Sequence, residues 1–413
     1  MSVILDTRDN AMKRTVQSYP SLGNVEGSAG GARLHRRPAA VPLVLFLFLF
    51  LALLFLASPA SASDAKVEAY GFTSSKTCGV CHKDIYEGFS HSLHSLSYTD
   101  PVFSMAYSKA YLETKGAAKE TCRKCHAPTT LFTKDADAAL PITSEGVACD
   151  FCHSIESVDL ASPDVFKLDV AGKKRASMKD AKSPAHSTAY AEWFNKSEMC
   201  AGCHEITSLH GLKTATTYSE WKKSEYAAKG VQCQGCHMPL VSGNPVDPSV
   251  KPASSGKVHD HSLSHNVDVM KGALRLHLVK SERSKGERYI VDIDVTNARA
   301  GHAVPTGTQP REVVLEVTVQ DADGRTESQK KTFGKKIADA DGKVIAPGGG
   351  ACVNGNKIIE NSSINPGETR KARFMFNIKP KEPVTITANA YLAYAPVVAA
   401  TEQTRIPLGS LEK

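Results

Sequence analysis

A five-residue motif, C-x-x-C-H, constrains this chain more than any other feature, because it occurs five times within residues 78–237. The motifs use ten of the eleven cysteines of the chain. This spacing is the attachment signature of c-type haem, in which two thiols bond the porphyrin as thioethers and the next residue is the proximal ligand of the iron. We therefore predict five covalently bound haem c groups, at Cys78-Cys81-His82, Cys122-Cys125-His126, Cys149-Cys152-His153, Cys200-Cys203-His204 and Cys233-Cys236-His237.

Structural zinc and disulfides are the two alternative uses of these cysteines. A tetrahedral zinc site does not require a histidine directly after every second cysteine, and neither does a disulfide scaffold in an exported protein. Five haems would leave only about 35–40 residues for each, too few for an ordinary core, so the porphyrins themselves would form the apolar interior. The motif region is therefore predicted to be a haem-packed domain made mainly of helices and loops.

The N-terminal segment has the order of parts that an export signal has. Three arginines precede the apolar run 42–57, and the small residues Ala60 and Ala62 follow it. This order is typical of a secretory signal peptide cleaved near Ser63. An uncleaved membrane anchor is the alternative, although the run is shorter than the roughly 20 residues that span a bilayer. We predict an export segment over 1–62, a periplasmic, extracellular or cell-surface location, and membrane contact only through this segment if it is uncleaved.

The charge of the chain argues against nucleic acid as a partner. The formal net charge is +7, but residues 1–62 contain six Lys/Arg and only three Asp/Glu, so the exported part is mildly basic. The one cysteine outside the motifs, Cys352, has no neighbouring residues that would activate it as a nucleophile. We expect no nucleic-acid partner and no catalytic role for this thiol.

The second half of the chain has a different pattern. Residues 241–258 are rich in Pro, Gly and Ser, which is typical of a linker. Apolar and polar residues then alternate in several short segments that are separated by turn residues, as in half-buried antiparallel strands. This pattern predicts an immunoglobulin-like β-sandwich. We therefore expect a multidomain chain with an export segment (1–62), a pentahaem cytochrome c domain (63–266) and a β-sandwich domain (267–413), with strands near 273–279, 289–295, 313–319, 370–378 and 384–392.

The second axial ligand decides whether an iron only passes electrons or also binds a small molecule. The exported part has nine histidines outside the motifs, and His277 is discounted because it alternates to the polar face of a strand. The remaining eight would suffice to close five irons, although histidines in loops also have structural roles. These candidates are His91 and His94, which share a helix face, together with His186, His210, His259, His261, His265 and His302.

Several stretches resemble multihaem c-type cytochromes of the superfamily that includes the tetrahaem electron acceptor of hydroxylamine oxidoreductase. These are FSHSLHS after the first motif, EGVACDFCHS around the third, and TYSEWKKSEYAAKGVQCQGCHMP leading into the fifth. The later stretches DHSLSHN, TNARAGHAVPTG and NPGETRKARF resemble a subset of these cytochromes with a C-terminal immunoglobulin-like domain. The likeness covers nearly all of residues 72–396.

The resemblance implies distal ligands as well as a function. It favours His94 over His91 and implies ligation by His186, His261 and His302, while the fifth distal ligand stays open among His259, His265 and His210. It implies an exported electron carrier in anaerobic or metal-linked respiration. Pentahaem nitrite reductases carry a lysine in place of one motif histidine, and because all five motifs here end in histidine, that enzyme is disfavoured.

Three functions follow as hypotheses. The leading one is a chain of mostly bis-histidine haems that exchanges electrons with redox partners, such as other cytochromes or a membrane quinol-oxidising complex. The first alternative is a multihaem redox enzyme in which one open haem acts on a nitrogen or sulfur oxyanion; the sequence indicates no catalytic residue for it. The second alternative is a subunit of a polymeric or cell-surface electron conduit, which would make the protein an oligomer or filament.

Overall fold

The computed structural model describes residues 71–251, 256–263, 270–284, 288–309, 311–346, 350–393 and 405–413, all within one compact unit. The predicted export segment and His265 lie outside the described residues. Within those ranges, no helix has the length and apolar character needed to cross a bilayer.

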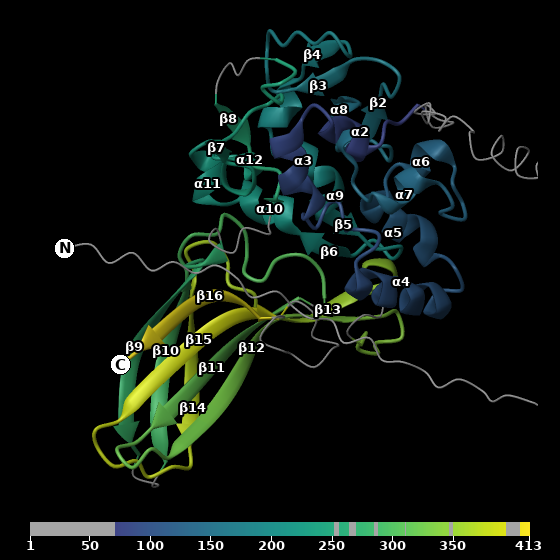
Figure 1. The fold of residues 1–413 in the computed structure, drawn as a ribbon. Helices are drawn as coiled ribbons and strands as arrows, with labels where there is room; N and C mark the ends of the chain where they lie inside the picture. Colours follow the sequence, from purple (N-terminus) through teal and green to yellow (C-terminus); the bar gives the residue numbers. More distant parts are fainter. Residues whose placement is uncertain are drawn as a thin grey trace, which may run out of the picture. The chain divides into compact units, whose positions relative to one another are not determined.

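The haem-motif region, residues 71–263, consists of short helices, loops and four two-stranded sheets (Figure 1). The small sheets are β1–β2 (Ile155–Val158, Phe166–Leu168), β3–β4 (Lys174–Ala176, Thr188–Tyr190), β5–β6 (Glu205–Thr207, Lys213–Thr216) and β7–β8 (Leu240–Ser242, Lys257–His259). The helices are α2 (Ser75–Gly79), α3 (Lys83–Ser90), α4 (Pro101–Glu113), α5 (Ala118–His126), α6 (Thr130–Thr133), α7 (Pro141–Ser144), α8 (Cys149–His153), η1 (Glu192–Asn195), α9 (Glu198–His204), α10 (Thr217–Lys222), α11 (Glu225–Ala228) and α12 (Cys233–His237).

Apolar burial in this region is divided among small clusters. The largest has five buried members, of which Phe72, Ile142 and Phe151 are the bulkiest. Others consist of only three or four buried residues each. Such clusters are far smaller than the core of a typical domain, in line with the expectation that the porphyrins supply the remaining apolar interior.

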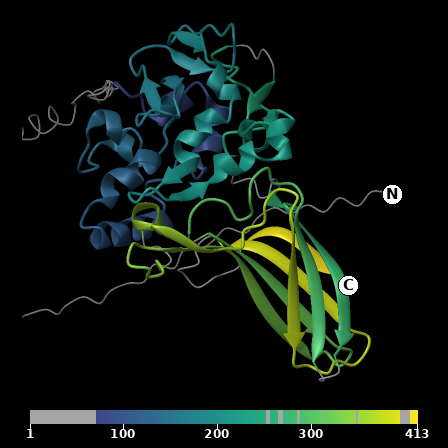
Figure 2. The same cartoon turned by 180° about the vertical axis from the view of Figure 1, so that it is seen from behind.

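The β-rich region from residue 270 onward contains two antiparallel sheets. Figures 1 and 2 show its long strands from opposite sides. One sheet has the order β14-β10-β9 and the other β13-β12-β11-β15-β16. The bounds are β9 (Leu274–Arg283), β10 (Tyr289–Asn297), β11 (Glu312–Gln320), β12 (Thr326–Ala338), α14 (Ala351–Asn354), β13 (Lys357–Asn361), β14 (Thr369–Phe376), β15 (Thr385–Ala393) and β16 (Arg405–Glu412).

Side chains from both sheets meet in one core of 21 buried residues. Val291 and Ile293 of β10 are at most 1% exposed, as are Leu315 and Val317 of β11. The alternation in the sequence therefore produces one buried and one open face per sheet. His277 lies exposed on β9, as the alternation predicts.

The segment expected to be a free linker is part of the haem-motif region. The amide of Asp247 donates to the carbonyl of Cys81 (2.7 Å), and Lys83 forms an ion pair with Asp247 (2.8 Å). The two ends of the segment pair as β7 and β8, with Leu240 opposite His259. Pro, Gly and Ser indicate an irregular backbone, and here that backbone packs on the first motif instead of connecting two bodies.

Candidate haem sites

The last four motifs have the same local structure, in which a short helix ends on the motif histidine. These helices are α5, α8, α9 and α12. Residues three and four apart share a helix face, so both thiols and the imidazole point to one side. In the first motif, helix α2 ends at Gly79, inside the motif, and His82 is the N-cap of the next helix, α3. In the last four motifs the local fold therefore presents the donor set toward one face, as covalent attachment plus axial ligation requires.

Hydrogen bonds to backbone carbonyls fix the orientation of three motif histidines. Nδ1 of His82 donates to Pro245, Nδ1 of His126 to Ser97 (2.8 Å), and Nδ1 of His153 to Arg175 (2.6 Å). A carbonyl oxygen only accepts, so the proton is on Nδ1 and the lone pair on Nε2. This is the tautomer in which Nε2 can bind a metal while the other nitrogen anchors the ring.

Three motif histidines each face a second imidazole from another part of the chain. The ring centroids of His82 and His186 lie 6.3 Å apart, and those of His94 and His204 also lie 6.3 Å apart. Those of His237 and His302 lie 6.2 Å apart. Two metal–nitrogen bonds of about 2 Å and two ring radii of about 1.1 Å add up to about 6.2 Å, so each pair has the spacing for one metal ion between the rings.

Burial favours the neutral form of three of the paired imidazoles, those of His94, His204 and His237. Burial, and then the neighbouring His126, lower the pKa of His94 to about 4. Burial is also the main reason why the pKa of His204 is lowered to about 3 and that of His237 to about 4. A neutral imidazole is the form that binds metal, so ligation at neutral pH would not first require loss of a proton.

His261 lies near the third motif. Burial, followed by the effect of His153, lowers the pKa of His261 to about 4. Its Nδ1 donates to the carbonyl of His259 (2.7 Å), while Nδ1 of His259 donates to the carbonyl of Met238 (2.7 Å). These two bonds fix the orientation of both rings.

Two of the sequence candidates have exposed, local surroundings. His91 follows α3, and its Nδ1 donates to the Glu87 carbonyl of the same helix (3.0 Å). His210 is exposed in the turn between β5 and β6. These exposed positions make both residues poor candidates for distal ligands. The prediction that His91 and His94 share a helix face is wrong, because α3 ends at Ser90 and His94 lies in the turn that follows.

The second motif differs from the three paired ones. The Phe103 ring stacks on His126 with a centroid distance of 4.0 Å and an interplanar angle of 14°. In the part of the chain that the structure describes, no imidazole faces His126 at the 6.2–6.3 Å spacing of the pairs. His265, a candidate for the fifth distal ligand, falls outside that part.

Hydrogen bonds between thiols of different motifs show which haem attachment sites adjoin one another. Cys78 donates a hydrogen bond to Cys149, which links the first and third motifs. Cys203 donates to Cys125, and Cys200 donates to Cys233, so the fourth motif adjoins both the second and the fifth. These sulfur atoms would be at porphyrin edges, so adjoining thiols imply adjoining haem edges.

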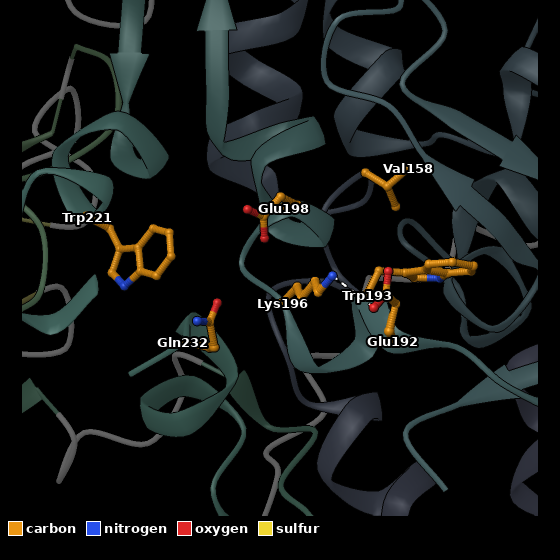
Figure 3. A pocket seen from close by; sticks show the side chains of 7 residues that line it. All are labelled: Val158, Glu192, Trp193, Lys196, Glu198, Trp221 and Gln232. Atoms are coloured by element: carbon orange, nitrogen blue, oxygen red, sulfur yellow. Dashed lines mark ion pairs between the residues drawn. The ribbon is translucent and has the colours of Figure 1, made fainter. Parts of the chain in front are cut away.

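Polar side chains also tie the fourth and fifth motifs together. Both the amide and the hydroxyl of Ser197, just before α9, donate to the Gln232 Oε1 just before α12 (2.9 Å each). The Ser197 hydroxyl in turn accepts from the amide of Cys233 (3.0 Å). An adjacent pocket of about 370 Å³, shown in Figure 3 with its Lys196–Glu192 ion pair, is lined by Val158, Glu192, Trp193, Lys196, Glu198, Trp221 and Gln232.

Sequence reasoning missed the surroundings of Cys352. This residue lies in α14, and its thiol accepts a hydrogen bond from Cys122 of the second motif. Both pack in a cluster with Ala110, Ala118 and Val353. The two cysteines are distant in the sequence and share no motif, so no spacing signal could have linked them.

Motif donor sets, facing imidazoles and adjoining thiols define a class of protein, the multihaem c-type cytochromes. Residues 77–154, which contain the first three motifs, match the family described as cytochrome c554 and c-prime. The search of curated proteins finds no match.

Among solved structures, the chain is similar to a penta-heme cytochrome c552 from Thermochromatium tepidum, with a TM-score of 0.63 and 20% identity over 83% of this chain and 100% of that chain. A structure from Bordetella pertussis described as an ApaA protein matches 34% of this chain and 90% of its own length, with 12% identity and a TM-score of 0.16. The family match and the first structural match support a multihaem c-type cytochrome, which is consistent with electron transfer.

Proposed function

We propose that this protein is an exported pentahaem c-type cytochrome that carries electrons between other redox proteins, in anaerobic or extracellular respiration. The observation that carries the proposal is the set of three imidazole pairs with centroids 6.2–6.3 Å apart. Haem c supplies a one-electron couple when it is bound, and an iron with two histidine ligands has no free position for a substrate. The chain's own contribution is to fix these ligands and to exclude water around them.

The proposed distal ligands come from several segments. His94 would serve the iron of His204, His186 that of His82, His302 that of His237, and His261 that of His153. Each pairing joins segments that are far apart in the sequence. The adjoining thiols support two groups of neighbouring haems, the first with the third and the fourth with both the second and the fifth.

The β-rich region supports an immunoglobulin-like sandwich in this proposal. Its two antiparallel sheets share one core, and the order β12-β11-β15-β16 against β9-β10-β14 resembles the two-sheet arrangement of immunoglobulin domains. The region would supply His302 as a ligand and a surface for a redox partner. It would be exported together with the haem-motif region after cleavage near Ser63.

Two measurements on the natively exported protein test this function. The intact mass gives the number of attached haems and the N-terminus of the mature chain, for which we expect five haems and a start near Ser63. Electron paramagnetic resonance of the oxidised protein gives the spin state of each iron. We expect mainly low-spin signals that do not change with nitrite or hydroxylamine, because closed irons cannot bind either molecule.

A redox enzyme is the second candidate, and the second motif is the observation that favours it. In the described part of the chain, no imidazole lies opposite His126 at the 6.2–6.3 Å spacing of the three pairs. An iron there without a sixth protein ligand could bind a nitrogen or sulfur oxyanion. A high-spin signal that shifts on addition of nitrite, and that is absent from a His126→Ala variant, would support the enzyme over the carrier.

A further inference from the structure

A buried ion pair connects the two regions beside His302. Oε1 of Glu220 in α10 lies 3.5 Å from Nζ of Lys335 in β12, and the lysine side chain is only 5% exposed. The lysine also donates to the Thr216 hydroxyl (3.4 Å) and to the Gly307 carbonyl (3.2 Å). A buried charge is tolerated only when it has partners of this kind. The pair therefore joins α10 of the haem-motif region to β12 and to the loop that follows His302.

Glu220 binds that loop at two points. Its Oε2 accepts from the hydroxyl of Thr306 (2.6 Å) and from the amide of Ala303 (3.2 Å). Its Oε1 accepts from the Thr216 hydroxyl (2.7 Å). Both carboxylate oxygens therefore accept hydrogen bonds. The backbone amide that Oε2 binds belongs to Ala303, the residue directly after His302.

Two hydrogen bonds, one to the ring and one to the backbone carbonyl, orient His302 in this loop. Its Nδ1 donates to the Ala303 carbonyl (2.9 Å), the same residue whose amide is bound by Glu220. Its carbonyl accepts from Nδ2 of Asn297, a side chain that is 1% exposed at the end of β10. Held in this way, the ring lies nearly parallel to that of His237, with an interplanar angle of 15°.

We propose that Glu220 is a positioning residue that anchors the loop of the β-rich region so that His302 can close the iron held by His237. The inference rests on the proposed function, because His302 has an iron to bind only if the fifth motif carries a haem. Lys335 has the supporting role of neutralising the carboxylate in its buried position.

The test compares Glu220→Ala with a matched control in the oxidised holoprotein. Glu225→Ala is the control, because Glu225 lies in the next helix and forms only an exposed pair with Lys229 (2.7 Å). We expect E220A to convert one haem in five from low-spin to high-spin, and E225A to convert none. Added imidazole should restore the low-spin signal of E220A, and E220Q, which keeps one acceptor oxygen, should lose less of it. A purely structural role would not respond to imidazole.

A double variant covers the case in which E220A leaves the buried charge of Lys335 without its carboxylate partner and the protein does not fold. E220A/K335M removes both charges, the two bonds from Glu220 to the His302 loop and the bond from Lys335 to Gly307, so we expect the same single high-spin haem. Combining E220A with His302→Ala should add nothing to H302A alone, because Glu220 acts through His302.

The outcomes separate this inference from the proposed function. If H302A converts one haem while E220A and E220A/K335M retain the wild-type spectrum, the role of Glu220 is refuted and the ligand assignment stands. If H302A itself leaves every haem low-spin, the assignment of His302 in the proposed function is refuted, and the role of Glu220 with it.

Discussion

The haem-motif region and the β-rich region bury their apolar side chains in different ways. The β-rich region brings 21 buried residues of two sheets into a single core. Among the described residues of the haem-motif region, the apolar clusters have at most five buried members each. The comparison teaches that the β-rich region can be stable on its own side chains, whereas the haem-motif region needs its cofactors as part of its interior.

The largest effect should come from preparing the full chain without haem. We expect the haem-motif region to lose its helical structure and to become accessible to protease, because its small clusters cannot offset the loss of chain entropy. The β-rich region should keep its strands. Circular dichroism and limited proteolysis with mass analysis measure both, and the comparison breaks down if residues 71–263 stay resistant without haem.

Two matched phenylalanines compare the cores directly. Phe376 is fully buried in the β core, and Phe72 is 1% exposed in the largest cluster of the haem-motif region. Phe376→Ala should lower the free energy of unfolding of its region by about 3–5 kcal/mol, the usual cost of such a cavity. Phe72→Ala should cost less in the holoprotein, because covalently held haem supplies much of the stability there. Chemical denaturation followed by haem absorbance and by far-ultraviolet signal separates the regions; equal losses would contradict the contrast.

The Ser197–Gln232 bonds should matter to one region only. Gln232→Ala removes the acceptor for two donors of Ser197, and at roughly 0.5–1.5 kcal/mol per hydrogen bond the haem-motif region should lose about 1–2 kcal/mol. Calorimetry should show its transition at lower temperature while that of the β-rich region is unchanged. A shift in both transitions would mean that the two regions unfold as one.

The smallest effect concerns an ion pair on the surface of the β-rich region. Arg373 donates two bonds of 2.8 Å to Asp292, and its side chain is 65% exposed. The hydrogen bond to Arg373 is the main reason why the pKa of Asp292 is lowered. Arg373→Ala should have only a small effect on the free energy of unfolding, because water screens the pair.

The pH dependence of that pair has a definite sign. A lowered folded-state pKa stabilises the protein fully above the unfolded value of about 3.9, and this contribution is lost as the pH falls through the folded value. The difference between wild type and R373A should therefore be constant near neutrality and disappear in acid. Urea denaturation at several pH values measures it, and a difference that grows as the pH falls would contradict this assignment.

How far the sequence could predict the fold depended on how regular each pattern was. The alternation in β10 and β11 predicted those strands, because every second residue is apolar and buried. Strand β12 was missed because its N-terminal half, TESQKK, is polar on both faces, and β16 was missed because it contains Pro407 and Gly409. Composition also misled at 241–258, where turn residues form specific contacts with the first motif.

The candidate sites could be predicted only in part. The C-x-x-C-H spacing is local, so it predicts one proximal donor for each motif, and this assignment stays a prediction. The resemblance to multihaem cytochromes indicated four distal ligands, His94, His186, His261 and His302. The structure places His94, His186 and His302 opposite motif histidines, and the assignment of His261 stays a prediction. Which motif each one faces is a property of the tertiary fold, and no local signal encodes it. Glu220 and Lys335 were missed for the same reason.

The central claim is that these three imidazoles, and not the exposed ones, face the motif irons. The most direct measurement is the spin-state count by electron paramagnetic resonance in single-histidine variants of the oxidised holoprotein. H94A, H186A and H302A should each convert one haem to high-spin, whereas the exposed controls H91A and H210A should convert none. Loss of a low-spin haem in H91A or H210A, or an unchanged spectrum in H94A, would contradict the account.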